Sequence, residues 1–350
     1  MQLHNIGSIA VRECPRGDAP YAAYAASSPA PTGYHRPEWL NAVEDAFGLP
    51  CFRLLAERDG QALGMLPLCH IKSALFGNFL VSVPFGNCGG IVVSDPAAHQ
   101  PLLDAAVRLA ESRGCRWVEL RQIEPLPLSL ETHTRKVVQV LPLKPDPEEM
   151  WKSLSSERRN RIRKAEKSGL TGEIVGREGL NDFYDVFARN MRDLGTPVYS
   201  RRFFEALFDH LADVMRICLV RGSDGTLMAA LVLVAYRKTI EAPWVAALRE
   251  YNSVCANNYL YWIAMKYGCE RGFELFDFGT SDRDSGVFQT KKQWGAEAIQ
   301  LHRQFWLAPG QTMPHLNPSN PKYAAKIRTW QKLPIWLTKL IGPPLAKKLP

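Results

Sequence analysis

The order of apolar and polar residues predicts two strand hairpins in separate parts of the chain. The first starts at Cys51, where CFRLLAE is followed by Asp59-Gly60 and then by ALGMLPLCHI. The second consists of VMRICLV, Asp224-Gly225 and MAALVLVAY. An Asp-Gly pair between two strand-like runs is typical of a tight hairpin turn, because both residues tolerate positive φ.

The segments that follow the two hairpins are also alike. After a further extended stretch, FLVSVPFGNCGGIVV, the first half predicts a helix from about Pro96 to Ser112 that ends at Gly114, and then the strand WVELRQI. The second half continues with the strand TIEAPWVAAL, a helix over 258–270, Gly272 and the strand FELFDFG. Because corresponding glycines keep nearly the same spacing, the pattern predicts a tandem repeat of one α/β module.

The repeat sets the expected domain organisation. A chain of 350 residues exceeds the usual size of one core, so two domains are expected. We predict an α/β fold with two modules, each a mixed twisted sheet flanked by helices, over 1–150 and 151–310. The Pro- and Lys-rich tail, 311–350, either lies in a membrane interface or packs back over the first module.

Composition narrows the function only slightly. The opening MQLHNIGSIAVREC does not resemble a signal peptide, and the longest apolar run, 227–236, is shorter than the roughly 20 residues that span a bilayer. The body is therefore expected to be soluble and cytoplasmic. The net charge of +8 favours anionic partners such as nucleotides, RNA, phosphorylated lipids or an acidic membrane surface. The eight cysteines form no C-x-x-C pair and no zinc-ligand spacing with His, so we expect reduced thiols and no metal.

A basic segment, SLSSERRNRIRKAEKSG over 153–169, lies between the modules. Arg159, Arg163 and Lys167 recur every four residues and would form one stripe on a helix. Six cations between 158 and 167 face only two glutamates, so their repulsion is largely uncompensated. The stripe is either a solvated helix face or a phosphate-binding surface.

The closing segment, FDFGTSDRDSGVFQTKKQWG over 276–295, holds the candidate catalytic residues. Its strand brings Asp277 to the carboxyl end of a sheet, where α/β folds place ligands. If the segment around Lys291 and Lys292 is extended, only one of these lysines faces the pocket. That lysine could stabilise the oxyanion of acyl transfer, while Asp277 accepts the proton of an attacking amine or simply holds the lysine in an ion pair. No Gly-x-Ser-x-Gly motif and no phosphate-binding P-loop motif occur.

Taken together, these motifs resemble the FemAB-like family of the GNAT acyltransferase superfamily. The resemblance is carried by FDFG with KKQWG at 291–295 and by further blocks along most of the chain. These blocks are RPEWL at 36–40, DGQALGMLPL at 59–68, SVPFGNCGG at 82–90, ERRNRIRKAEKSG, LGTPVYSRRFFEAL at 194–207 and NPSNPKY…LP…IGPPLA in the tail. The last two blocks look most like the branch associated with exosortase (PEP-CTERM) and exopolysaccharide systems.

The resemblance implies an acyltransferase that uses aminoacyl-tRNA or acyl-CoA as donor and binds no permanent cofactor. Relatives form an amide on an amine of a peptidoglycan or other cell-envelope precursor, and a lysine of the KKxWG segment stabilises the carbonyl. That role falls on Lys292, with Lys291 as the substitute. A lipid-linked glycan acceptor would place the enzyme at the inner face of the inner membrane. The candidate substrate-binding residues are Arg159, Arg163, Tyr199, Arg201, Ser281, Arg283 and Ser285.

The chain departs from the family pattern at three points. Thr280 stands where the branch commonly has Arg, and Thr290 stands where Phe usually precedes the lysines, so Arg283 is the candidate replacement cation. The loop REYNSVCANN lacks the Q/R-x-x-G-x-G/A cradle of coenzyme A-binding relatives. Acetyl-CoA-dependent transfer to a sugar or small amine, and a non-catalytic anion-binding assembly factor, are therefore the alternative functions. The sequence does not identify the donor, the acceptor or the oligomeric state.

Overall fold

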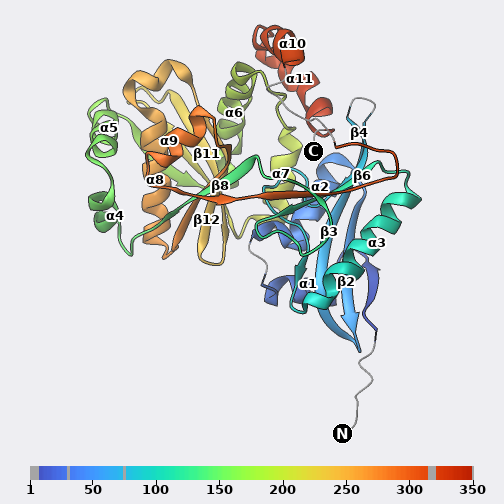
Figure 1. The fold of residues 1–350 in the computed structure, drawn as a ribbon. Helices are drawn as coiled ribbons and strands as arrows, with labels where there is room; N and C mark the ends of the chain where they lie inside the picture. Colours follow the sequence, from blue (N-terminus) through green and yellow to red (C-terminus); the bar gives the residue numbers. More distant parts are fainter. Residues whose placement is uncertain (1–7, 30–31, 74–75, 314–320, 349–350) are drawn as a thin grey trace. The chain divides into compact units, whose positions relative to one another are not determined.

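The computed structural model describes residues 8–29, 32–73, 76–313 and 321–348 (Figure 1). The chain forms two compact units. Unit 1 consists of the described residues of 1–135 and 300–315, and unit 2 of those of 136–299 and 316–349.

Unit 1 is built on an eight-stranded sheet in the order β1-β2-β3-β4-β6-β15-β7, with β5 paired to β3. Its strands are β1 (Ala10–Cys14), β2 (Cys51–Arg58), β3 (Gln61–Ser73), β4 (Gly77–Val81), β5 (Val92–Val93), β6 (Trp117–Gln122), β7 (Glu131–His133) and β15 (His302–Leu307). Its α-helices are α1 (Ala19–Ser27), α2 (Pro37–Phe47) and α3 (His99–Ser112), with 3-10 turns at Gly33–His35 and Pro96–Ala98. All pairs are antiparallel except β4 with β6, so the sheet is mixed.

Unit 2 is built on a seven-stranded sheet in the order β14-β8-β13-β12-β11-β10-β9. Its strands are β8 (Lys136–Pro142), β9 (Thr171–Val175), β10 (Met215–Arg221), β11 (Leu227–Tyr236), β12 (Thr239–Ala247), β13 (Leu275–Asp282) and β14 (Glu297–Gln300). Its α-helices are α4 (Pro147–Ser153), α5 (Ser156–Lys167), α6 (Leu180–Leu194), α7 (Arg201–Leu211), α8 (Ala256–Glu270), α9 (Gly286–Lys292), α10 (Pro321–Gln331) and α11 (Ile335–Ala346), with 3-10 turns at Arg177–Gly179 and Arg249–Val254.

The predicted repeat is confirmed element by element. In each unit two helices lead from an edge strand into the predicted hairpin, and a third antiparallel strand follows. A crossover helix, α3 or α8, then leads to a strand that pairs in parallel with that third strand. Both hairpin turns have the predicted Gly at positive φ, +78° at Gly60 and +79° at Gly225. Each crossover helix likewise ends before a glycine at positive φ, Gly114 or Gly272.

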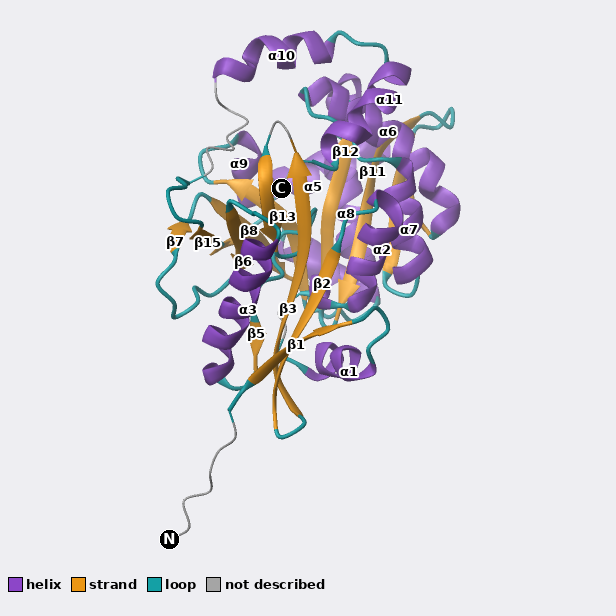
Figure 2. Cartoon of the chain, turned by 90° about the vertical axis from the view of Figure 1, so that its right-hand side faces the viewer, coloured by secondary structure: helices purple, strands orange, loops and turns teal. Residues whose placement is uncertain are grey.

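Helices cover both faces of each sheet. In unit 1, α3 buries Leu102 and Ala106 against β2, β3 and β6, while Tyr21 of α1 packs with Met65 on the other face. In unit 2, α4, α5 and α8 share one core with the sheet. Aromatic residues of α6 and α7 pack on the opposite face, where Phe204 meets Trp244 of β12 edge-on at 5.2 Å between ring centroids. Figure 2 shows strands and helices coloured by type.

One strand crosses between the repeats in each direction. β8 follows the first repeat in sequence but pairs antiparallel with β13 of unit 2. β15 follows the second repeat and pairs antiparallel with β6 of unit 1. The expected boundaries at 150/151 and 310/311 therefore differ from the units, which change at 135/136 and 299/300. The boundaries move because of backbone pairing. β13 and β6 each have an open edge opposite the parallel partner, and the strand that crosses over from the other repeat, β8 or β15, pairs with that edge.

The described part of the tail packs on α6 in unit 2, not with the first module as one expectation had it. Figure 1 shows α10 and α11 running beside α6. Arg192 of α6 donates Nη1 to the carbonyl of Leu333 at 3.3 Å, and Gln331 donates to the carbonyl of Asp193 at 2.9 Å. Gly342 of α11 lies so near Val198 that a Cβ there would be 3.1 Å from the Val198 nitrogen. The NPSNPKY block lies largely outside the described residues.

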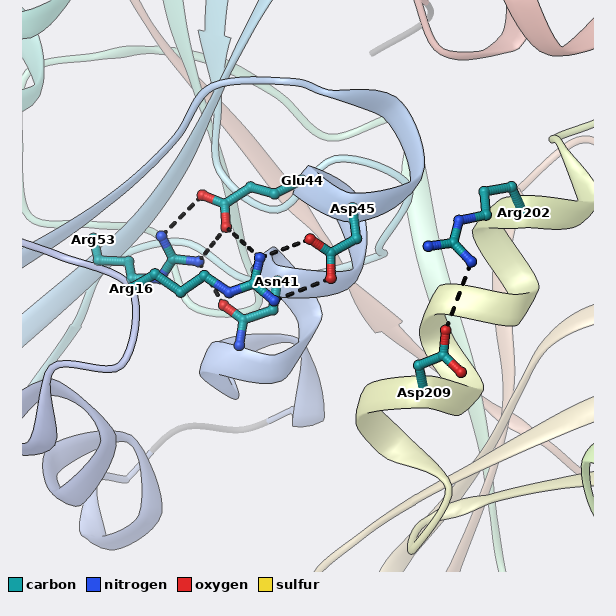
Figure 3. A network of polar contacts seen from close by, with 7 residues as sticks. All are labelled: Arg16, Asn41, Glu44, Asp45, Arg53, Arg202 and Asp209. Carbon is teal, nitrogen blue, oxygen red and sulfur yellow. Dashed lines mark hydrogen bonds and ion pairs between the residues drawn. The ribbon is translucent and has the colours of Figure 1, made fainter.

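A buried arginine attaches α2 to the sheet of unit 1 (Figure 3). Arg53 of β2 is 3% exposed and donates to both carboxylate oxygens of Glu44, at 3.0 and 2.9 Å, and to Asn41 Oδ1 at 2.8 Å. Arg16 makes a similar bidentate contact with Asp45, at 2.7 and 3.0 Å, but its side chain is 44% exposed. The two arginine–carboxylate pairs have similar hydrogen-bond distances, but the Arg53 side chain is buried and the Arg16 side chain is not.

We expect Arg53→Met to lower the free energy of unfolding by about 2 to 4 kcal/mol, because it removes the hydrogen bonds that Glu44 and Asn41 accept in a partly buried site and leaves Glu44 only the longer contact with Arg16, at 3.8 Å. Arg16→Met should cost less than about 1 kcal/mol, since an exposed pair is well solvated when broken. Urea denaturation of the two variants measures the difference. Equal losses would show that burial does not set the strength of these pairs.

Candidate functional site

The candidate site forms where two parallel strands of unit 2 separate. β12 and β13 pair over only three positions, the last of which joins Glu241 to Asp277. Beyond it, β12 stays with β11 while β13 continues along β8. The β13–β8 register shifts between Asp277 and Thr280, and Gly279 within this bulge has φ +72°. Glycine adopts this left-handed conformation without the steric cost that a Cβ would add.

Asp277 lies half-buried at the start of the bulge. Its Oδ1 accepts the backbone N–H of Gly279 at 2.7 Å. Burial raises the pKa of Asp277 to about 6, because desolvation disfavours the carboxylate more than the Gly279 N–H and the nearby Lys291 favour it. The carboxyl group therefore changes protonation close to neutral pH, as a general base does.

Lys291 is buried, with 5% of its surface exposed, and comes from α9. Its Nζ donates to the carbonyls of Gly279 and Thr280, both at 2.9 Å. Burial lowers its pKa to about 8, and Asp277 opposes this shift. The bulge is thus held from both sides, with Asp277 on the Gly279 N–H and Lys291 on the Gly279 carbonyl. An ammonium has three N–H bonds, so one remains for a further acceptor.

Lys292, the residue first assigned the catalytic role, is exposed. The expectation of an extended segment is wrong, because residues 286–292 form helix α9, which Ser285 caps by accepting the Phe288 N–H at 3.1 Å. Successive residues on a helix are rotated by about 100°, so the two lysines still point differently. The structure turns Lys291 toward the bulge, and Lys292 is the solvated neighbour.

Three further polar residues, Glu241, Gln139 and Ser281, surround the bulge. Only Ser281 was a candidate from the sequence. Glu241 is 9% exposed and lies opposite Asp277 in the register of the parallel strands β12 and β13. Gln139 of β8 is fully buried opposite the bulge and donates Nε2 to the Phe288 carbonyl of α9 at 3.1 Å. Ser281 Oγ and Gln139 Oε1 are buried without a hydrogen-bond partner among the described residues. A lone acid inside the apolar run TIEAPWVAAL was the signal for Glu241.

Other candidate residues of the loop have mainly local contacts. Ser285 caps α9 and also donates Oγ to the Asp282 carbonyl at 2.7 Å. Arg283 is exposed. Asp282 forms an ion pair with Lys136 of β8 at 3.0 Å. The loop is thereby fixed at both ends of the turn that leads into α9.

The predicted helix in the basic segment is present, as α5, and Ser155 caps it. Its stripe is partly used inside the fold, because Arg159 donates to the carbonyls of Lys152 and Leu154 at 3.0 and 2.9 Å. Arg163 lies over the Trp151 ring, 5.3 Å from its centroid. These contacts join α4 to α5 and favour a structural role for both arginines.

Arg158, by contrast, points from α5 to the candidate site. It is 2% exposed and donates Nη2 to Gln293 Oε1 at 2.5 Å. It also lies over Trp294, 5.6 Å from the ring centroid. Gln293 and Trp294 directly follow the lysine pair, so Arg158 ties the basic helix to the end of α9. The sequence interpretation missed it because its neighbours in the charge run are solvated.

The two candidates of the 194–207 block lie on or next to α7. Tyr199 accepts a hydrogen bond at its backbone carbonyl from the Tyr184 hydroxyl, at 2.9 Å, and its ring contacts Phe203. Arg201 is exposed and forms an ion pair with Glu205 one turn on, at 3.2 Å. These contacts are with residues of α6 and α7.

The start of α8 has an unusual residue. Cys255 precedes the helix at φ +62°, a conformation that usually requires glycine, and no side chain caps the helix there. It is 8% exposed. The glycine-poor loop noted in the sequence thus reaches a left-handed turn without a glycine.

Within the described ranges, no group of three or more His, Cys, Asp or Glu could hold a metal. All eight cysteines are free thiols. A groove of about 410 Å³ is lined by residues of β9, β10 and α8, including Arg216, Lys266 and Arg271, but by neither Asp277 nor Lys291. None of the helices in the described part of the chain is both long and apolar enough to span a bilayer.

Unit 1 has a counterpart of the site, which is closed. Its parallel strands part after Val81 and Glu119, the position that corresponds to Asp277. Glu119 is 1% exposed and paired with Arg121 at 3.0 Å and Arg303 at 3.5 Å. Arg121 also donates to the Gly86 carbonyl at 2.8 Å. Glu119 and Arg121 thus form an ion pair inside the fold, and Arg121 Nη2 is buried without a hydrogen-bond partner among the described residues.

Comparisons with known proteins place this geometry in a family context. Residues 155–286 match the family model of the acetyltransferase (GNAT) domain. No curated protein sequence matches the chain. Among solved structures, FemX is 17% identical, with a TM-score of 0.65 over 84% of this chain and 96% of FemX.

Two further structures cover nearly the whole chain. L-PGS from Bacillus licheniformis is 14% identical, with a TM-score of 0.55 over 91% of this chain and 95% of that protein. A tandem GNAT protein from the clavulanic acid biosynthesis pathway is 12% identical, with a TM-score of 0.56 over 87% of this chain and 100% of that protein. The chain therefore has a tandem GNAT fold that includes a GNAT acyltransferase domain, and the FemAB-like resemblance is confirmed at the level of the fold.

The raised pKa of Asp277 predicts an unusual pH dependence of stability. Its folded pKa of about 6 lies above the usual range, so between about pH 4 and 6 the folded state binds more protons than the unfolded state, and stability falls as pH rises. Relative to Asp277→Asn, wild type should lose free energy of unfolding across this window. Urea titrations at several pH values test this, with Asp284→Asn as an exposed control from the next loop. A constant difference between wild type and Asp277→Asn would contradict it.

Proposed function

We propose that this protein is a FemAB-like acyl- or aminoacyltransferase that forms an amide on an amine of a cell-envelope or exopolysaccharide precursor. The observation that carries the proposal is the β13 bulge, which the buried Lys291 and the half-buried Asp277 bind from two sides. Asp277 lies within residues 155–286, which match the GNAT acetyltransferase domain, and Lys291 follows shortly after them. Strongly shifted pKa values of opposite groups in one site are typical of catalytic machinery.

The reaction needs a hydrogen-bond donor for the oxyanion and an acceptor for the proton of the amine, and Lys291 and Asp277 can supply them. As the amine nitrogen attacks the ester or thioester carbonyl, the new N–C bond forms and the carbonyl oxygen becomes negative, and the free N–H of Lys291 stabilises that oxygen. Asp277 accepts the proton of the amine. When the C–O bond to tRNA or the C–S bond to coenzyme A breaks, that proton passes to the leaving oxygen or sulfur. Nothing is oxidised or reduced.

Lys291 is favoured over Lys292 for the role of oxyanion donor. An oxyanion donor is most effective where water is excluded, because the low dielectric strengthens the interaction. Lys291 is 5% exposed and fixed by two carbonyls, whereas Lys292 is exposed at the end of α9. The fixed geometry also spares the reorganisation that a mobile lysine would need.

The donor is either aminoacyl-tRNA or acyl-CoA, and no permanent cofactor is required. The loop before α8 lacks the glycine cradle of coenzyme A-binding relatives, and Cys255 occupies its left-handed position, which favours aminoacyl-tRNA. A lipid-linked acceptor would place the reaction at the inner face of the inner membrane, and the motif resemblance supports a PEP-CTERM-associated exopolysaccharide system. Arg283, Ser281, Tyr199 and Arg201 remain the candidate acceptor contacts.

A non-catalytic anion-binding factor is the weaker alternative. It would need the α5 stripe to be available, but Arg159 binds two backbone carbonyls and Arg163 lies over Trp151. A binding surface also gives no reason to bury an ammonium beside a carboxyl group of raised pKa. Catalysis accounts for both observations.

Substitution of the two lysines tests the mechanism. Lys291→Met should lower kcat/KM by about 10²- to 10³-fold, the effect of removing one oxyanion donor, while Lys292→Met should change it less than about threefold. Release of free tRNA from alanyl-, seryl- or lysyl-tRNA, and of thiol from acetyl-CoA, would be measured with a lipid-linked peptidoglycan or glycan precursor extract as acceptor.

The folded state of each lysine variant needs its own control. Lys291→Met removes donors from the Gly279 and Thr280 carbonyls, so its melting temperature should be compared with that of Lys291→Arg, which keeps the charge. A folded Lys291→Met with full turnover would exclude this lysine from catalysis. Loss of turnover in Lys292→Met alone would return the role to Lys292.

The pH dependence of the rate follows from the two pKa values. Asp277 must be deprotonated and Lys291 protonated, so kcat/KM should rise through about pH 6 and fall above about pH 8. Asp277→Asn should lower the rate by about 10²-fold or more and remove the acid limb of the profile. An acid limb that persists in Asp277→Asn would assign the base to another group.

A further inference from the structure

Helix α11 has an inverted distribution of large and small residues. Its inward side carries Thr338, Gly342 and Ala346, one helical turn apart and all buried. Its exposed large apolar residues are here called the outward face. These are Trp336 at 66% exposure, Leu340 at 65%, Ile341 at 36% and Leu345 at 39%, and the two most exposed, Trp336 and Leu340, lie opposite the buried side. A surface helix normally buries its large apolar side and exposes its small or polar side.

The inward contacts fix this orientation. Gly342 allows α11 to approach the backbone of Val198, and Lys339 forms an ion pair with Asp185 of α6 at 2.5 Å. Lys339 also lies 5.4 Å from the centroid of the Tyr184 ring. Rotation of α11 to bury the outward face would break these contacts. Exposure of Trp336 and Leu340 is therefore a property of the folded chain.

The charge around the outward face has one sign. Residues 321–350 include no Asp or Glu, and their cations are Lys322, Lys326, Arg328, Lys332, Lys339, Lys347 and Lys348. Lys332, at the N-terminal side of α11, and Lys348, just beyond its end, are exposed. Lysines at both ends of an apolar helical face are typical of a helix that lies in a membrane interface.

We propose that the outward face of α11 docks on a bilayer that contains anionic phospholipids. Its apolar residues would enter the boundary between headgroups and acyl chains, and the flanking lysines would contact lipid phosphates, each contributing to the attraction near a negative surface. A second copy of this chain fits less well, because it would bring two faces of the same positive charge together. Docking is independent of which acyl group is transferred.

Vesicle flotation of the full-length protein, without substrate, tests the docking. Wild type should float with vesicles of phosphatidylcholine and phosphatidylglycerol, and added salt should weaken this binding by screening. Leu340→Ser should weaken the binding by about tenfold or more, since it removes a large apolar side chain from the contact. Ile299→Ser is the matched control, because Ile299 is an exposed apolar residue of β14 at 37% exposure, away from α11.

A second variant keeps the test independent of local packing. Lys347→Glu with Lys348→Glu changes only charge and should reduce binding to anionic vesicles by at least about tenfold. Absence of flotation, equal flotation with pure phosphatidylcholine, or equal binding by Leu340→Ser would each overturn the proposal. Conversion of a dimer to a monomer by Leu340→Ser would assign the face to a second copy instead. None of these results bears on Lys291, so the transferase proposal stands or falls separately.

Discussion

Two parallel strands that pair over only three positions determine the chemistry of each half of this molecule. In both units the strands part after an acid, Glu119 or Asp277, and from there the edge of β6 or β13 that faced the parallel partner is open. The strands that cross over from the other repeat, β15 and β8, pair along the opposite edge, both before and after the acid. Backbone groups at the point of separation must still be satisfied. In unit 2 the satisfaction comes from two ionisable side chains, and this places charge where a sheet would otherwise be apolar.

Duplication gives the same backbone two uses. In unit 1 the acid is neutralised by Arg121 and Arg303, and Arg121 ties the strand to the loop that contains Gly86. Close packing completes the closure, since a Cβ on Gly89 or Gly90 would lie within 2.3 Å of a neighbouring side chain. In unit 2 the cation is a lysine with one N–H left over. The Arg121 guanidinium binds the Glu119 carboxylate and the Gly86 carbonyl, and it therefore stabilises the fold. A lysine of lowered pKa that keeps one free N–H can instead bind a substrate.

The sequence predicts local structure well and exchange between repeats poorly. Asp-Gly turns, helix-ending glycines and apolar runs act within a few residues, so both hairpins and both crossover helices were predicted. The partner of β13 lies more than a hundred residues earlier, and no local pattern marks β8 as belonging to unit 2. The sequence could not decide between Lys291 and Lys292 for a related reason. The choice depended on the conformation of 286–292, where Ser285 caps a helix that is only seven residues long. Arg159 and Arg163 were likewise judged from charge alone, although backbone carbonyls and Trp151 engage them.

A purely structural role for Lys291 does not explain why an ionisable residue holds the bulge. Two backbone carbonyls can be satisfied by a neutral amide, as the Phe288 carbonyl is by Gln139. Burial of the ammonium instead lowers its pKa to about 8, which means that the folded state stabilises the charged form less well than water does. The same holds for Asp277, whose pKa of about 6 records a disfavoured carboxylate. Each group thus lies closer to neutrality than it would in solvent, and proton transfer between substrate and protein becomes easier in the pH range where acyl transfer is needed. A pair that costs stability at neutral pH is better accounted for by a reaction than by the fold.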